Sequence, residues 1–118
     1  MKKLMLFFAA LLPFCGATAQ EQAQTETGIS FLEGTYAEAL KAAKDAGRIL
    51  FIDCYTQWCG PCKQMAKTTF KDAEVAEFFN ESFINLKLDM ETPDGIAQKT
   101  KLGVNAYPTP VSYTHLRA

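Results

Sequence analysis

The chain has 118 residues, of which 48% are hydrophobic and 21% are charged, and its net charge is -1. This length allows one domain, and this composition is typical of a globular protein rather than a disordered or fibrous one. Its 12 basic and 13 acidic residues alternate along the chain, so charge does not point to nucleic acid or anionic lipid as a partner.

The first residues have the pattern of a secretory signal peptide. Lys2 and Lys3 form a basic start, residues 4–14 form an apolar run too short to span a bilayer, and Ala17 and Ala19 give a small-residue cleavage pattern. We therefore expect residues 1–19 to be removed on export, with the periplasm as the destination. A secreted or membrane-anchored protein is the alternative.

Cleavage would remove Cys15 and leave Cys54, Cys59 and Cys62. An odd number of cysteines argues against a pure disulfide framework and favours a working thiol. Exported proteins meet an oxidising environment, so a dithiol that stays active there needs an external partner to reduce or oxidise it.

The mature chain begins with a polar lead-in, residues 20–28, followed by "GISFLEG", residues 28–34, which predicts a short first strand. Thr35 and Glu38 then form a capping-box pattern. Together with an apolar stripe and a glycine at its end, this pattern predicts a helix from about Tyr36 to Ala46.

A central strand is predicted next, because residues 48–55, "RILFIDCY", form a nearly continuous apolar run of the kind buried on both faces of a sheet. Residues 62–70 and 72–80 predict one interrupted helix or two helices, the latter capped by Asp72. Residues 82–90 alternate as a strand does. Strand, helix and strand at this spacing predict a parallel βαβ unit.

The remaining chain contains one more helix and strand. Residues 91–95, "ETPDG", should break the chain, residues 96–103 predict a short helix, and residues 104–113, "VNAYPTPVSY", lead into another strand. The element order places the Cys-x-x-Cys motif at the carboxyl end of the central strand, where open α/β sheets place their sites.

The motif predicts two different cysteines. Cys59 would lie at the N-terminus of the following helix, where unpaired N–H groups and the helix dipole stabilise a thiolate, so we expect it to attack. Cys62, one turn further on, would resolve the mixed disulfide. Gly60 would let the backbone turn tightly, and Pro61 would rigidify the first turn without removing a needed N–H.

The segment "WCGPCK", with Asp53 upstream and "YPT" downstream, resembles the thioredoxin family over roughly residues 29–111. Within it, the chain is similar to exported thioredoxin-like proteins and to the periplasmic domain of membrane thiol-relay reductases. The resemblance implies an α/β thioredoxin fold with a central mixed sheet flanked by helices. It also implies a thiol:disulfide oxidoreductase that reduces protein disulfides without a cofactor, with a membrane thiol relay as its electron donor.

The resemblance also assigns residues around the redox disulfide. Asp53 matches the buried carboxylate that relays the proton of Cys62. Pro108 matches the family's cis proline, which brings the backbone of Tyr107 beside the cysteines to pair with a substrate strand. Trp58 would form a flat apolar wall at the site.

Two positions depart from the family pattern. Asn85 stands where the family often has a lysine facing the buried acid, and Lys87 follows two residues later on the same side of the strand. Whether Lys87 replaces that lysine is left open. Cys54, the neighbour of Asp53, points to the other face, and we expect it to be a small core residue rather than a redox group.

Three other functions are alternatives to a disulfide reductase. A zinc site is disfavoured, because beyond Cys59 and Cys62 the mature chain offers only Cys54 and His115 as partners, so we predict no metal. A binding or chaperone module would use the substrate groove without turnover, which two intact cysteines argue against. A disulfide oxidase or isomerase, or a cytochrome c maturation thioredoxin, is the remaining alternative to a reductase.

The end of the chain is expected to be incomplete. The thioredoxin-like domain, residues 29–110, should stop before the family's C-terminal hairpin and helix. Residues 111–118 lack the expected strand, glycine turn and helix pattern. We therefore predict that this tail is not native and that His115 has no function.

Overall fold

The computed structural model describes residues 27–114, so the predicted signal peptide, nearly all of the lead-in and His115 lie outside the described residues. No helix within the described range is long and apolar enough to cross a membrane. The elements follow in the order α1 (Tyr36–Ala46), β1 (Ile49–Tyr55), α2 (Gly60–Lys67), the short helix η1 (Thr69–Lys71), α3 (Ala73–Ser82), β2 (Phe83–Asp89), α4 (Pro93–Leu102) and β3 (Thr109–Tyr113).

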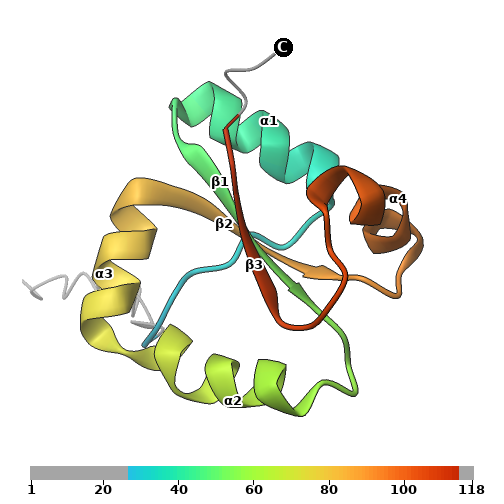
Figure 1. Cartoon of the computed structure of the whole chain (residues 1–118). Coiled ribbons are helices and arrows are strands. Elements are labelled where there is room, and N and C mark those ends of the chain that lie inside the picture. The colour runs from blue at the N-terminus through green and yellow to red at the C-terminus, as the bar shows by residue number, and fades with distance from the viewer. Residues whose placement is uncertain (1–26, 115–118) are drawn as a thin grey trace, which may run out of the picture.

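The strands form a mixed sheet in the order β2-β1-β3. The central strand β1 runs parallel to β2 and antiparallel to β3. Helices α1 and α4 lie on one face of the sheet, and α2 and α3 lie on the other (Figure 1). The predicted central strand and the predicted mixed sheet flanked by helices are therefore confirmed.

Local sequence signals explain where the helices begin and end. Thr35 and Glu38 form the predicted capping box, and Gly47, at φ 63°, ends α1 in the left-handed conformation that glycine adopts without a steric penalty. The Asp72 side chain accepts hydrogen bonds from the first N–H groups of α3, so the second predicted helix after the cysteines is separate from the first.

Helix α4 begins earlier than predicted. Thr92 caps it with its side chain, and Pro93 occupies the first turn, where a missing N–H costs nothing. The segment "ETPDG" thus starts a helix rather than breaking the chain. The signal was the Thr-Pro pair, which marks a helix start as well as a turn.

The predicted first strand is wrong except at one position. Leu32 forms a single parallel bridge with Leu86 of β2. Ile29, three residues earlier, instead donates its backbone N–H to the carbonyl oxygen of Phe70, in the short helix η1, at 2.8 Å. Because the backbone bonds of this segment go to different elements, no ladder forms.

Strand β3 extends into the segment predicted to be non-native. Val111 pairs with Ile52 and Tyr113 pairs with Leu50 of β1. This confirms the strand predicted from "VNAYPTPVSY" and shows that residues 111–113 are part of the sheet. The non-native origin of the segment remains a prediction.

Each face of the sheet has its own apolar cluster. The cluster facing α1 and α4 is closed: Leu50, Ile52, Cys54 and Leu86 within it are all 0% exposed. The cluster facing α2 and α3 is smaller and aromatic, and it is built from Ile29, Phe51, Phe70 and Ala76 with partly buried side chains around them. The second face also carries Asp53 of the central strand, which is the start of the candidate site.

Candidate redox site

The two cysteines lie at the junction between β1 and α2 and form a disulfide. Cys59 is the N-cap of α2, and its Sγ accepts a hydrogen bond from the backbone N–H of Cys62 at 3.1 Å. This places the Cys59 sulfur where the helix dipole and an N–H group stabilise a thiolate. The cysteines are 2% and 4% exposed, so exposure alone does not decide which one attacks.

The two residues between the cysteines have different structural roles. Pro61 lies in the first turn of α2, where its missing N–H needs no partner. Gly60 does not adopt a positive φ, and a Cβ at this position would meet nothing within 4 Å. The expectation that Gly60 is needed for a tight turn is therefore wrong for this fold, and its missing side chain leaves open space next to the disulfide.

Asp53 lies in β1, the strand that leads to the disulfide, and is 1% exposed. Neither of its carboxylate oxygens has a hydrogen-bond partner among the described residues. Burial raises the pKa of Asp53, and the positive charge of Lys87 opposes that rise. A carboxyl group with a raised pKa can take up and return a proton at a higher pH than an exposed one.

Lys87, not Asn85, faces the buried acid. It pairs with Asp53 in the register of β1 and β2, and its Nζ lies 3.8 Å from Asp53 Oδ2. Asn85 lies opposite Phe51, and its amide donates long hydrogen bonds to the carbonyl oxygens of Ser30 and Phe79, at 3.4 and 3.3 Å. The sequence assignment of Asn85 to the lysine position is thus corrected by the strand register.

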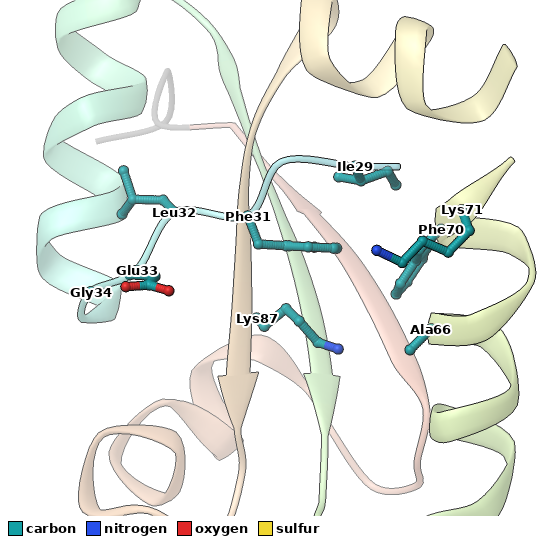
Figure 2. A pocket seen from close by; sticks show the side chains of 9 residues that line it. All are labelled: Ile29, Phe31, Leu32, Glu33, Gly34, Ala66, Phe70, Lys71 and Lys87. Atoms are coloured by element: carbon teal, nitrogen blue, oxygen red, sulfur yellow. The ribbon is translucent and has the colours of Figure 1, made fainter. Parts of the chain in front are cut away.

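Aromatic rings surround the Lys87 ammonium group. Its Nζ lies 4.9 Å from the ring centroid of Tyr55, 5.5 Å from that of Phe31 and 6.0 Å from that of Phe70. These distances allow cation–π attraction. The side chain points into a hollow of about 440 Å³ between the segment around Phe31 and the end of α2 (Figure 2). The lysine therefore reaches both the buried acid and solvent.

The exposed rim of the site is aromatic. Trp58 is 66% exposed, so it is not a core residue. Its indole N–H donates to Glu91 Oε1 at 2.8 Å, and its ring meets the ring of Tyr107 edge-on at 5.9 Å. The Tyr107–Pro108 peptide bond is cis, as predicted. The structure thus brings Trp58, Tyr107 and Pro108 together.

Sequence reasoning missed the contacts that hold the loop before Cys59. One is the bond from Trp58 to Glu91 described above. The other is a hydrogen bond from the Gln57 side chain to Asp89, at the end of β2, at 3.0 Å. The only available signal was a pair of acidic residues, Asp89 and Glu91, at the end of a predicted strand, which is common at turns.

Cys54 lies on the opposite face of β1 and is 0% exposed. Burial, with a smaller contribution from the charge of Asp53, raises the pKa of its thiol to about 12, so it stays protonated at neutral pH. The prediction of a core position is confirmed. Within residues 27–114 no group of three or more His, Cys, Asp or Glu side chains is arranged to hold a metal ion.

Comparison with known proteins identifies the family. A family model described as thioredoxin-like matches residues 31–114. The protein belongs to the thioredoxin-like family. A solved structure of a candidate disulphide-isomerase from Bacteroides thetaiotaomicron is 50% identical, with a TM-score of 0.65 over 73% of this chain and 71% of that one.

Two curated relatives show how much of a longer protein this chain can correspond to. A thioredoxin of Echinococcus granulosus is 39% identical over 61% of this chain, which spans 62% of that protein. The thiol:disulfide interchange protein DsbD of Pseudoalteromonas atlantica is 29% identical over 63% of this chain, which spans 13% of that protein. The chain therefore corresponds to one domain-sized part of these relatives.

Proposed function

We propose that this protein is an exported thiol:disulfide oxidoreductase that reduces disulfides in other proteins. The observation that carries the proposal is the Cys59–Cys62 disulfide at the N-terminus of α2, together with the buried Asp53 carboxyl group on the strand that leads to it. The Cys-Gly-Pro-Cys motif and the names of the relatives, a thioredoxin and a thiol:disulfide interchange protein, support this activity.

The reaction begins with the reduced dithiol. The Cys59 thiolate attacks one sulfur of a substrate disulfide, forming a bond to that sulfur and releasing the other as a thiolate that takes up a proton. Cys62 then loses its proton toward Asp53, and its thiolate attacks Cys59 Sγ. The Cys59–Cys62 bond forms, the bond from Cys59 to substrate breaks, and the second substrate sulfur leaves and is protonated.

The exposed rim provides the surface for the substrate. An extended substrate segment pairs with the backbone next to the cis peptide bond of Tyr107 and Pro108. The exposed Trp58 ring and the open space at Gly60 let a protein strand approach the disulfide closely. This arrangement favours a peptide chain rather than a small molecule as substrate.

The reducing direction requires an external electron donor, because each turnover leaves the cysteines oxidised. A membrane thiol relay is the proposed donor, supported by the predicted signal peptide at residues 1–19 and by the likeness to DsbD. Fractionation of cells expressing the full gene with a C-terminal tag tests the location: a processed form in the periplasm supports it, and a cytoplasmic unprocessed form contradicts it.

Disulfide isomerisation is the second candidate, favoured by the 50% identical candidate disulphide-isomerase. The same residues serve both reactions, since an isomerase returns the mixed disulfide to a new substrate thiol instead of resolving it through Cys62. Reactivation of scrambled ribonuclease by a Cys62→Ser variant would favour isomerisation. Loss of all activity in that variant favours reduction.

Reduction of insulin with dithiothreitol as electron donor tests the proposed function. The native protein should speed insulin precipitation, and Cys59→Ser should reduce the rate to that of dithiothreitol alone. Cys62→Ser should accumulate a mixed disulfide visible by mass spectrometry. A native protein that leaves the rate unchanged would be a binding module rather than an enzyme.

A further inference from the structure

Thr56, the residue that follows β1, is 1% exposed, and its hydroxyl oxygen has no hydrogen-bond partner among the described residues. The same is true of both carboxylate oxygens of Asp53. Buried polar groups are nearly always hydrogen-bonded, to protein or to ordered water. The unpartnered oxygens of Thr56 and Asp53 therefore call for ordered water as their partner.

A hollow of about 270 Å³ lies at this position. Thr56 lines it together with Cys62 and Lys87, and the Lys87 ammonium group connects it to Asp53, whose Oδ2 is 3.8 Å away. Lys87 and Ala66 also line the larger hollow of Figure 2, so the two spaces meet at the lysine. The hollow is large enough for several water molecules, and it has the polar partners that ordered water needs.

Resting on the proposed function, we propose that Thr56 is a further residue of the proton path, whose hydroxyl holds ordered water between Cys62 and Asp53. The hydroxyl can donate one hydrogen bond and accept two, so it can orient water toward both groups. Lys87 Nζ, 3.8 Å from Asp53 Oδ2, adds a hydrogen-bond donor in the same hollow. Thr56 acts through water and is a positioning residue.

The step that it assists is resolution of the mixed disulfide. The Cys62 thiol gives its proton to water held by Thr56, and that water passes a proton to the Asp53 carboxylate. The Cys62 thiolate forms the bond to Cys59 Sγ while the bond from Cys59 to substrate breaks. The departing substrate sulfur is protonated from solvent, and Asp53 later returns its proton to solvent along the hollow beside Lys87. Thr56 gains and loses no proton.

The experiment follows a single turnover of the full, reduced chain with a disulfide-bonded peptide, quenched with acid and read by mass spectrometry. Thr56→Val keeps the shape of the side chain without its hydroxyl, and Thr56→Ser keeps the hydroxyl. In Thr56→Val the mixed disulfide should form at the native rate and decay about tenfold more slowly, because the water that accepts the Cys62 proton is no longer held in place. Thr56→Ser should decay within about twofold of native. Thr100→Val, at an exposed position on α4, is the matched control and should change neither rate.

Two results would overturn the inference: native decay in Thr56→Val, or equally slow decay in Thr56→Val and Thr56→Ser. If Thr56→Val does not fold, Thr56→Ala takes its place with the same expected slowing. Failure of the native protein to form a mixed disulfide at all would overturn the proposed function as well. The two failures are therefore distinguishable.

Discussion

Asp53 and Cys54 are neighbours in β1, yet they belong to two different environments. Both are buried, and burial raises the pKa of each. Cys54 sits in the closed apolar cluster under α1 and α4, while Asp53 lies 3.8 Å from Lys87, which lines two hollows. Because successive side chains point to opposite faces, a single strand separates the part that stabilises the fold from the part that handles protons.

The largest expected effect is a loss of stability when the closed apolar cluster under α1 and α4 is disrupted. Leu86→Ala removes a fully buried side chain from the cluster that contains Cys54, so the free energy of unfolding should fall by about 2–5 kcal/mol. Ile96→Ala, at a side chain that is 61% exposed, is the control and should change it by less than about 0.5 kcal/mol. Denaturant unfolding measures both. Equal losses in the two variants would mean that this face is not the main core.

On the other face, Asp53→Asn should separate activity from stability. Without a proton acceptor, resolution of the mixed disulfide at pH 7 should slow on the order of 100-fold. The folded protein should nevertheless become more stable at neutral pH, because the raised pKa of Asp53 means that ionising the buried carboxyl costs folding free energy.

The sign of that stability change depends on pH. Below the ordinary Asp pKa of 3.8 the carboxyl is protonated in both the folded and the unfolded chain. In that range the unfolding free energies of the native and Asp53→Asn proteins should therefore change with pH in the same way. As the pH rises through the raised pKa, the native protein alone should lose stability. Denaturant unfolding across this range tests the effect, and a native protein that instead gains stability would contradict the assigned environment.

A smaller effect should follow from removing the cation beside the acid. Lys87 lowers the pKa of Asp53, so Lys87→Met should raise that pKa further. The pH at which disulfide resolution reaches half its maximum should then move upward, with little change in the maximum itself. Lys101→Met, an exposed lysine near Tyr36 and Tyr113, is the control and should leave the pH profile unchanged. An unmoved profile in Lys87→Met would mean that the lysine does not influence the acid.

The smallest expected effect on activity comes from Cys54→Ala. Its thiol lies in the closed cluster and stays protonated, so insulin reduction should remain within about twofold of native. Loss of the sulfur should lower the unfolding free energy by about 1 kcal/mol. Activity as low as that of Cys59→Ser would show that the two faces are not functionally separate.

Much of this division could be predicted from sequence, because local signals carry it. The capping residues predicted where α1 and α3 begin, and the apolar run predicted the central strand. The alternation of side chains along that strand predicted that Asp53 and Cys54 lie on opposite faces. The Cys-Gly-Pro-Cys turn and the Tyr107–Pro108 pair then located the site from two distant segments.

The features that could not be predicted from sequence depend on how segments distant in the chain pack against one another. Asn85 and Lys87 have the same parity on β2, and only the register against β1 decides which one faces Asp53. The bond from Trp58 to Glu91 joins side chains 33 residues apart. The hollow at Thr56 depends on the packing of α2 over the strand, for which no single residue carries a signal.

The exposed Trp58 has one further consequence, for spectroscopy. It is the only tryptophan in the chain, and it precedes Cys59 directly. Because this residue is already 66% exposed in the folded protein, unfolding changes its exposure to solvent little. Tryptophan emission should therefore be a weak monitor of denaturation and a sensitive optical monitor of disulfide opening and of substrate docking.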